Sequence, residues 1–286
     1  MPRRRDGGIG EPVLNDEARL SDELFGRFTK LLSAKTGIAL REYKKYLVIS
    51  RLATIVGPGK RFDTFEGFYQ ALCQETDGAW TQTFINALTT NYSFFFRDAI
   101  HFLALGQYLR DRGADEPYLR LWSAASSTGE EAYSMAITLT NHGAPLPSDR
   151  RILATDISTK VLTHAETGLY ASEAVLKNVE PRDQKRYFES VDDGRKFQVR
   201  PVLREQVDFR QLNLQSIYPF RKKMDVIFLR NVMIYFGARE KAEVVQKMYD
   251  HLKPGGLLII GLSESLAGIR HRFVSYKSSI FRKEGA

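Results

Sequence analysis

Two short stretches of the chain carry residues suited to holding a nucleoside. The apolar run Leu119–Ser123 leads into small residues at 124–128 and then into an acidic pair that includes Glu131. A second apolar run ends on Asp156. Small residues let a ligand approach the backbone at the carboxyl end of a strand, and a carboxylate on the next strand can accept hydrogen bonds from ribose hydroxyls. The spacing therefore predicts a site for an adenosine-containing cofactor.

The same loop indicates which cofactor the site takes. A nicotinamide site favours Gly-x-Gly-x-x-Gly and an acid about 20 residues further on. Here the loop has the single glycine Gly129, and Asp156 lies 33 residues after Ser123. No Gly-x-x-x-x-Gly-Lys-Ser/Thr run is present either. A nucleoside ligand without a pyrophosphate fits better, and S-adenosylmethionine is the common one.

Alternating strands and helices must position these residues from Asn91 onwards. We expect strands at 118–123, 151–155, 224–229 and 257–261 and helices at 98–110, 129–140, 158–167 and 239–252. Such alternation predicts an α/β fold with a mostly parallel sheet and helices on both faces. The rhythm breaks between Ser172 and Asp208, where 196–200 and 206–209 alternate like short strands, so we expect an inserted β-subdomain there. A final strand pair is expected between Phe273 and Arg282.

The part of the chain before Asn91 has a helical pattern. Apolar residues fall at helical spacing in four segments, 24–32, 43–56, 65–72 and 80–88. Gly37 follows the first segment as a C-cap, and Gly57-Pro58-Gly59 stops the second. These patterns predict a small all-α N-terminal domain, and the charged, Gly-rich residues 1–18 predict a disordered basic tail before it.

Positive charge is concentrated in one part of this helical region. The chain carries a net charge of +8. Residues 35–61 hold seven basic side chains and the single acid Glu42. Arg41, Lys44 and Lys45 are predicted to share one face of the second helix, because positions three and four apart are neighbours. Either this face docks an acidic partner or it is an ordinary solvated surface.

Composition limits the class of protein. The chain has 286 residues, of which 43% are hydrophobic, enough for one large and one small domain. Cys73 is the single cysteine, which excludes internal disulfides and cysteine-based metal clusters, so no metal site is expected. No apolar run approaches the roughly 20 residues that span a bilayer, and the basic N-terminus lacks the apolar segment of a secretory signal. We therefore expect a cytoplasmic protein without membrane insertion.

Four segments together resemble the signature blocks of the CheR-type chemotaxis receptor methyltransferases. They are Asn91–Asp98, Trp122–Ser134, Ala154–Ser158 and Arg230–Phe236, with Leu252–Gly256 as a connecting feature. No block is decisive alone, but their order is specific, and the resemblance covers roughly residues 20–282. It implies a helical domain at 19–90 that docks the receptor. It also implies a Rossmann-like methyltransferase domain at 91–286 with a small β-subdomain inserted at about 172–208.

The resemblance also implies a reaction. The methyl group of S-adenosylmethionine would pass to glutamate side chains on the cytoplasmic methylation helices of transmembrane chemoreceptors. The products would be glutamate methyl esters and S-adenosyl-L-homocysteine. A carboxylate is already a nucleophile at neutral pH, so positioning and a water-poor site are needed rather than a strong base.

Two residues are carried over from the family as catalytic. Arg97 would hold the acceptor carboxylate or lie across the cofactor, using its fixed fork of donors. The Tyr235 hydroxyl would donate a hydrogen bond that orients the attacking oxygen. The alternatives are a surface ion pair of Arg97 with Asp98 or another acid, and a purely packing role for the Tyr235 ring.

The remaining positions of the family pattern contact the cofactor. Asp156 would take the ribose hydroxyls, with a helix N-cap near Ser158 as its alternative. Glu131 is the family's acidic contact, although Thr128 and Glu131 also have the spacing of a capping box. The other cofactor positions are Asn91, Ser93, Arg97, Ala124, Asn213, Leu214, Arg230 and Asn231.

The resemblance gives the basic region a partner. Receptor methylation helices are acidic, so Arg41, Lys44, Lys45 and Arg51 become candidate docking residues. Some relatives grip a tether peptide at the receptor C-terminus with the β-subdomain. The hairpin region Ser190–Val199 is short here and has only Gly194, so we expect no tether.

Three other functions compete with this one. A nucleic-acid methyltransferase would explain the positive charge, but base-methylating enzymes carry Asn/Asp-Pro-Pro-Tyr where this chain has Asn231–Phe236 without prolines. We therefore expect no nucleic-acid partner. A non-catalytic signalling module is disfavoured by the joint presence of Arg97, Asp156 and Tyr235, and a small-molecule methyltransferase would leave the basic helical domain unexplained.

Overall fold

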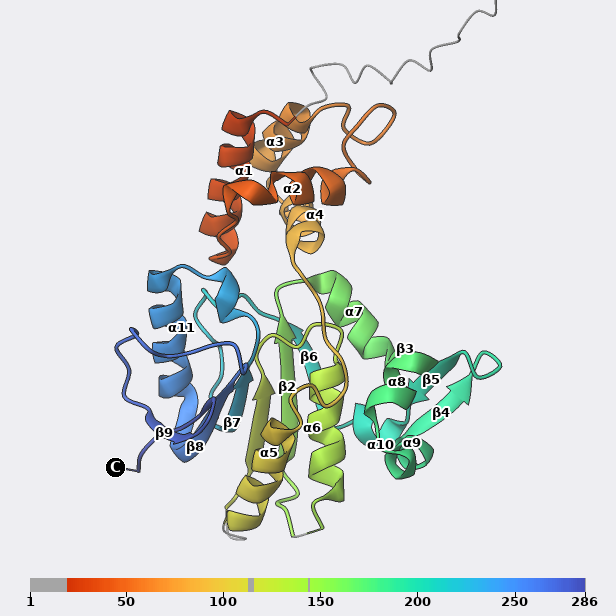
Figure 1. The fold of residues 1–286 in the computed structure, drawn as a ribbon, viewed down its shortest axis with the longest axis vertical. Helices are drawn as coiled ribbons and strands as arrows, with labels where there is room; N and C mark the ends of the chain where they lie inside the picture. Colours follow the sequence, from red (N-terminus) through yellow and green to blue (C-terminus); the bar gives the residue numbers. More distant parts are fainter. Residues whose placement is uncertain (1–19, 113–115, 144, 286) are drawn as a thin grey trace, which may run out of the picture. The chain divides into compact units, whose positions relative to one another are not determined.

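The structure is a computed structural model that describes residues 20–112, 116–143 and 145–285. The tail predicted at 1–18 lies outside these ranges. The described residues divide into two compact units. One unit holds residues 20–32 and 40–88, and the other holds 33–39 and 89–285 (Figure 1). In the described ranges, no helix is both long and apolar enough to cross a bilayer.

The first unit is helical, as predicted. Its elements are α1 (Asp22–Thr36, whose last residues belong to the second unit), the 3-10 helix η2 (Glu42–Lys44), α2 (Lys45–Leu52), α3 (Phe65–Gln74) and α4 (Ala79–Leu88). Its core is aromatic: the Phe28 ring centroid lies 6.0 Å from that of Phe68 and 5.5 Å from that of Phe84. All three side chains are buried. Gly37 has φ +76° directly after α1, which confirms the predicted C-cap.

The second unit is built on a seven-stranded sheet. Its strands are β1 (Leu119–Ser123), β2 (Arg150–Asp156), β6 (Val207–Gln211), β7 (Met224–Leu229), β8 (Leu252–Ile260), β9 (Val274–Lys277) and β10 (Ile280–Arg282). The order is β6-β2-β1-β7-β8-β10-β9. The first five strands in this order pair in parallel, and β10 pairs antiparallel with both β8 and β9. The chain moves from β1 to β2 in one direction and later returns to β7 on the other side of β1. Ligands of doubly wound sheets bind at the carboxyl ends of the strands beside such a switch point.

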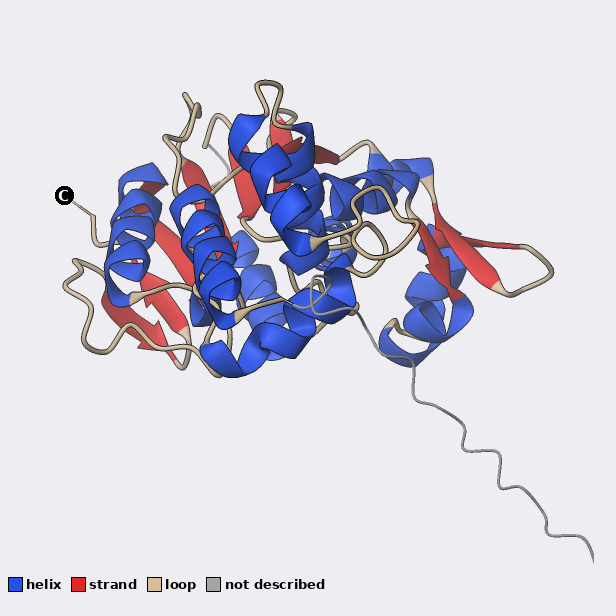
Figure 2. Cartoon of the chain, turned by 90° about the horizontal axis from the view of Figure 1, so that it is seen from above, coloured by secondary structure: helices blue, strands red, loops and turns tan. Residues whose placement is uncertain are grey.

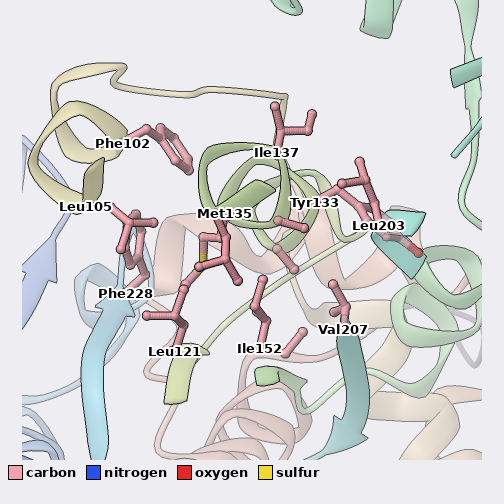
Figure 3. Packing of buried hydrophobic residues seen from close by; sticks show 14 of the residues in the cluster. Phe102, Leu105, Leu121, Tyr133, Met135, Ile137, Ile152, Leu203, Val207 and Phe228 are labelled. Atoms are coloured by element: carbon pink, nitrogen blue, oxygen red, sulfur yellow. The ribbon is translucent and has the colours of Figure 1, made fainter. Parts of the chain in front are cut away.

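Side chains of the sheet alternate between two hydrophobic clusters. Leu121 and Phe228 pack on one face, with α5 (Ile100–Asp111), α6 (Glu130–Asn141) and α7 (Thr159–Thr167). Figure 3 shows side chains of α5 and α6 meeting Leu121 and Phe228. Trp122 packs on the opposite face, with α11 (Ala238–His251). Helices on both faces confirm the predicted α/β fold.

The insertion contains helices as well as the predicted strands, and its first element begins at Leu169 instead of the predicted Ser172. It contains β3 (Leu169–Ala171), α8 (Ser172–Asn178), α9 (Pro181–Tyr187), β4 (Phe188–Val191), β5 (Lys196–Val199) and α10 (Pro201–Arg204). Its three strands form an antiparallel sheet in the order β3-β5-β4. The β4–β5 hairpin extends away from the seven-stranded sheet, at the right of Figure 2.

One predicted part of the insertion belongs elsewhere. Residues 207 and 208 begin β6, which pairs in parallel with β2 and is an edge of the seven-stranded sheet. Because β6 is an edge strand, its side chains alternate between buried and exposed, as in a short solvent-facing hairpin. The sequence pattern did not distinguish these two situations.

Candidate active site

Asp156 ends β2 at the switch point. Its Oδ2 accepts a hydrogen bond from the Ser127 amide at 2.9 Å, and its Oδ1 accepts one from the Ser158 amide at 3.0 Å. The carboxylate therefore joins the turn after β1 to the turn before α7. Burial raises the pKa of the Asp156 carboxyl above its ordinary value, against the opposing effect of these hydrogen bonds.

The loop around Asp156 fits a polar ligand. The hydroxyls of Ser126 and Ser127 are buried, and neither has a hydrogen-bond partner in the described part of the chain. Buried polar atoms are normally paired, so unpaired hydroxyls beside a carboxylate are suited to sugar hydroxyls or similar groups. The loop is also tightly packed: Gly129 has φ +95°, and a Cβ there would lie 2.7 Å from the Ala165 Cβ.

Glu131, in the first turn of α6, lies in a buried charged network. Its Oε1 accepts a hydrogen bond from the Ser123 hydroxyl at 2.6 Å, and its Oε2 accepts one from Arg230 Nη1 at 2.8 Å. Arg230 Nη2 donates to Asp98 Oδ2 at 2.7 Å and to the Arg97 carbonyl at 2.6 Å. Glu131, Asp98, Arg230 and Arg97 therefore lie together, joining α6, the end of β7 and the segment before α5.

The capping box proposed for Thr128 and Glu131 is wrong. The N-cap position of α6 is Gly129, so no side chain caps the helix. The Thr128 hydroxyl donates to the Glu130 carboxylate at 2.7 Å instead. Glu131 turns the other way because the buried guanidinium of Arg230 needs a carboxylate.

Arg97 lies in a tight turn. The residues on either side, Phe96 and Asp98, have φ values of +54° and +55°. Its Nη1 donates to the Tyr92 carbonyl at 3.1 Å, and its guanidinium lies 5.8 Å from the ring centroids of both Tyr92 and Phe94. The proposed ion pair between Arg97 and Asp98 is wrong, because Asp98 pairs with Arg230 instead. The half-exposed guanidinium of Arg97 is left without a carboxylate partner among the described residues.

Tyr235 is the last residue of the 3-10 helix η3 (Met233–Tyr235), which follows β7. Its side chain is half-buried, and the described residues offer its hydroxyl no hydrogen-bond partner. Its carbonyl accepts a hydrogen bond from the Ala39 amide at 2.9 Å. Asn231, at the start of the same loop, has φ +56°. The 3-10 helix and the hydrogen bond from Ala39 therefore hold the backbone at Tyr235 in place.

The segment Ser33–Ala39 belongs to this unit and contacts two predicted site residues. Besides the bond from Ala39, the Asn213 amide group donates to the Lys35 carbonyl at 2.7 Å. Ile38 forms an isolated antiparallel bridge with Phe236. Leu214, next to Asn213, is buried, and its carbonyl accepts a hydrogen bond from the Tyr218 hydroxyl at 2.9 Å.

The remaining predicted cofactor positions are spread over two segments. The Asn91 amide group donates to the Thr89 hydroxyl at 3.2 Å. The Ser93 hydroxyl interacts with the Glu130 carboxyl, whose pKa burial raises. Ala124 is buried at the end of β1, and its amide donates to the Phe228 carbonyl at 2.8 Å.

Two family descriptions match nearly all of the described chain. "CheR methyltransferase, SAM binding domain" matches residues 91–281, and "CheR methyltransferase, all-alpha domain" matches residues 23–89. The chain belongs to the CheR methyltransferase family. Its cofactor is S-adenosylmethionine, and the matched binding domain includes Asp156, Glu131 and Arg230.

Relatives of similar length agree with this family. The chemotaxis protein methyltransferase of Escherichia coli (strain K12) is 37% identical over 273 residues, covering 94% of this chain and 93% of the relative. That of Vibrio anguillarum is 36% identical over 259 residues, covering 89% and 93%. Chemotaxis protein methyltransferase 1 of Pseudomonas aeruginosa is 36% identical, covering 85% and 90%.

The basic residues of this CheR-family methyltransferase lie in the helical unit but not on one helix face. Arg41 is extended and precedes η2, Lys44 is in η2, and α2 begins only at Lys45. The prediction that the three share a face of one helix is therefore wrong. Lys45 pairs with Asp22 at 2.6 Å, and Arg51 Nη1 donates to the Leu88 carbonyl at 2.8 Å. Arg41 is exposed, while Lys44 is half-buried against the Tyr43 ring.

Sequence reasoning missed Glu264. This residue follows β8, and its carboxylate accepts hydrogen bonds from the amides of Asn231 and Met233, both at 2.8 Å. The signal available was an acid just beyond the carboxyl end of a parallel strand, where site residues of such folds gather.

Proposed function

We propose that this CheR-family methyltransferase transfers the methyl group of S-adenosylmethionine to glutamate side chains of chemoreceptors, forming glutamate methyl esters. The observation that carries the proposal is a pair of donors without an acidic partner: the Arg97 guanidinium and the Tyr235 hydroxyl. Both residues are connected to the Arg230–Glu131 pair. The Arg97 carbonyl accepts a hydrogen bond from Arg230, and Tyr235 lies in the loop that begins at Arg230.

These donors suit a carboxylate acceptor. Bound S-adenosylmethionine supplies a methyl group on a sulfonium, which an ionised carboxylate can attack without a general base. Arg97 presents a fork of N–H groups that matches the two oxygens of a carboxylate. The Tyr235 hydroxyl can then donate to one oxygen and leave the other directed at the methyl group. In this proposal both residues orient the substrate, and neither has to remove a proton.

The cofactor residues divide between the two sides of the switch point. Asp156 would accept from the ribose hydroxyls, beside the unpaired hydroxyls of Ser126 and Ser127. Glu131 accepts two hydrogen bonds already, but a carboxylate has about four acceptor sites, so it can also accept from the amino group of the cofactor. The other residues proposed to contact the cofactor are Asn91, Ser93, Arg97, Ala124, Asn213, Leu214, Arg230 and Asn231.

The helical unit is proposed to dock the acidic methylation helices in the cytoplasm. Of the four basic candidates, Arg41 and Lys44 make no ion pair within the described chain, whereas Lys45 and Arg51 already bind groups of the unit. Arg41 and Lys44 are therefore the better candidates for binding an acidic helix. A solvated surface without a partner remains the alternative for this region.

We also expect the enzyme to act without a receptor tether peptide. The turn of the β4–β5 hairpin is closed internally, since Asp192 pairs with Arg195 at 2.6 Å and with Lys196 at 3.7 Å. Calorimetry with a receptor C-terminal peptide tests this expectation, and saturable micromolar binding would overturn it.

The deciding experiment follows labelled methyl from S-adenosylmethionine to a chemoreceptor cytoplasmic fragment. Mild alkali should release labelled methanol, because carboxyl methyl esters hydrolyse under conditions that leave N-methyl groups intact. Transfer should fall steeply in Tyr235→Phe and Arg97→Ala while the affinity for S-adenosylmethionine persists. Alkali-stable label, or transfer that is unchanged in Tyr235→Phe, would contradict the proposal.

A further inference from the structure

The carboxylate of Glu264 gathers three backbone amides. Its Oε2 accepts hydrogen bonds from Asn231 and Gly261, and its Oε1 accepts one from Met233, all at 2.8 Å. Glu264 lies in the turn after β8, where its own amide donates to the Gly261 carbonyl at 2.9 Å. One side chain thus ties the end of β8 to the loop after the neighbouring strand β7.

This carboxylate acts as the cap of η3. The first amides of a helix have no partner within the helix, and Val232, the N-cap residue of η3, provides no side-chain hydrogen bond. Glu264 supplies the missing acceptor at Met233, the first residue of η3. It also holds the amide of Asn231, whose φ of +56° is uncommon for a residue with a side chain.

Tyr235 is two residues beyond the amide that Glu264 holds. Within η3 the Tyr235 amide donates to the Val232 carbonyl at 3.1 Å, and at the far end the Tyr235 carbonyl accepts from Ala39 at 2.9 Å. The short helix is therefore held at its start by Glu264 and at its end by Ala39. Because η3 is only three residues long, the direction of the Tyr235 side chain depends on both anchors.

The junction requires both a carboxylate and close packing. Three N–H donors meet two oxygens, so an amide in place of the carboxylate would turn an NH2 group towards at least one donor. The space is also limited: a Cβ at Gly261 would lie 2.7 Å from the Asn231 Nδ2 and 2.8 Å from the Glu264 Oε2. No other side-chain type of similar size offers two acceptors at this point.

We propose that Glu264 is a positioning residue for methyl transfer, which acts by fixing the η3 helix and so the direction of the Tyr235 hydroxyl. The proposal rests on the role proposed above for Tyr235. It assigns Glu264 no contact with either substrate.

The kinetic test compares Glu264→Gln, Tyr235→Phe and the double variant in the labelled-methyl assay. Since small misplacements in an active site are costly, Glu264→Gln should lower kcat roughly 10- to 100-fold. Affinity for S-adenosylmethionine and KM for the receptor should change much less. The double variant should be as slow as Tyr235→Phe alone, because Glu264 acts through Tyr235. Multiplied losses, or equal losses of kcat and cofactor affinity, would overturn the proposal.

The matched control is Glu243→Gln, an isosteric change on the surface of α11, where Glu243 pairs with the exposed Arg239 at 2.8 Å. It should leave kcat unchanged. If Glu264→Gln does not accumulate as folded protein, Glu264→Asp serves the same comparison, because it keeps the charge and shortens the reach.

A second readout separates this proposal from the proposed reaction. With 3-fluorotyrosine incorporated, the fluorine resonance of Tyr235 is the one that disappears in Tyr235→Phe. Glu264→Gln should shift or broaden that resonance, and Glu243→Gln should not. An unchanged resonance contradicts the positioning role even if transfer is observed. A shifted resonance without ester formation in the wild type contradicts the reaction alone.

Discussion

The guanidinium of Arg230 lies 2.8 Å from the carboxylate of Glu131, although the two residues are far apart in the sequence. The Arg230 side chain is only 1% exposed and that of Glu131 only 11%. The pair joins the end of β7 to the start of α6, and Glu131 also accepts a hydrogen bond from Ser123 at the end of β1, so it links the ends of the two strands beside which the cofactor is proposed to bind. A buried pair of this kind is costly to break, because the remaining charge has no water to solvate it.

Arg230→Met should therefore destabilise the protein by about 3–5 kcal/mol, the typical cost of removing one partner of a buried ion pair. Chemical denaturation measures this free energy of unfolding. The control is Arg239→Met, whose side chain is 85% exposed and which should change the free energy of unfolding far less, because an exposed ion pair stabilises a fold only weakly. Equal losses in the two variants would mean that the Arg230 network does not stabilise the fold.

Gly129→Ala should weaken binding of S-adenosylmethionine and lower the melting temperature. The new Cβ would lie 2.7 Å from the Ala165 Cβ and 2.9 Å from the Tyr170 hydroxyl, so the loop after β1 must move. Gly194→Ala is the control, since Gly194 also has positive φ, +81°, but its nearest neighbour would be 3.9 Å away. Calorimetric titration of both variants isolates the steric effect from the backbone strain that they share.

Asp156→Asn should weaken S-adenosylmethionine binding roughly 10- to 100-fold, from the loss of hydrogen bonds to a charged acceptor. Asp149→Asn, on the surface just before β2, is the matched control, because its carboxylate pairs with Arg120 and Lys222. The wild-type affinity should also fall in acid. Because burial raises the pKa of Asp156, its carboxylate is protonated at higher pH than an exposed aspartate. The Asp156→Asn variant should lack this pH dependence.

His101 should make the protein sensitive to acid. Burial and the nearby charge of Arg230 lower its pKa from 6.5 to about 4, so it is neutral in the folded state. Below pH 6.5 the unfolded chain binds a proton that the folded chain does not, and stability is lost as pH falls towards 4. The loss between pH 7.5 and pH 5 should be roughly 2 kcal/mol. Denaturation curves of His101→Gln should lack this component, and an unchanged pH profile would contradict the assignment.

Charge reversal in the helical unit tests the docking surface. Arg41→Glu with Lys44→Glu should raise KM for an acidic receptor fragment at least 10-fold at low salt, an effect that shrinks at high salt. Affinity for S-adenosylmethionine should not change. Lys177→Glu with Lys185→Glu, two exposed residues of the insertion, is the control for net charge. Equal effects of the two double variants would point to a non-specific role of positive charge.

Much of the fold follows from local patterns in the sequence. Strand β7 is buried along its whole length, as its apolar run 226–229 predicts for a central parallel strand. The positions of Asp156 and Glu131 beside the switch point follow from the strand order that such alternation implies. Edge positions were harder to predict, because β6 alternates like a free hairpin strand even though it pairs with β2.

Residues with distant partners could not be assigned from their neighbours in the sequence. Glu131 has the spacing of a capping box, and only the folded chain shows that Arg230 takes its carboxylate. Likewise Asp98 is adjacent to Arg97 but pairs with Arg230. Glu264 gives no periodic signal, because its function depends on amides that another strand brings to it.

The segment Ser33–Ala39 has a consequence for dividing this chain into modules. It binds Asn213 and Tyr235 within the catalytic unit, yet in the sequence it comprises the end of α1 and the residues just after it, ahead of most of the helical unit. A fragment beginning at Thr89 would retain the seven-stranded sheet and lose the partners of both residues. Chimaeras that exchange the catalytic unit between relatives should therefore carry residues 33–39 from the same parent. A single crossover near residue 89 would combine the catalytic unit of one protein with the 33–39 segment of another.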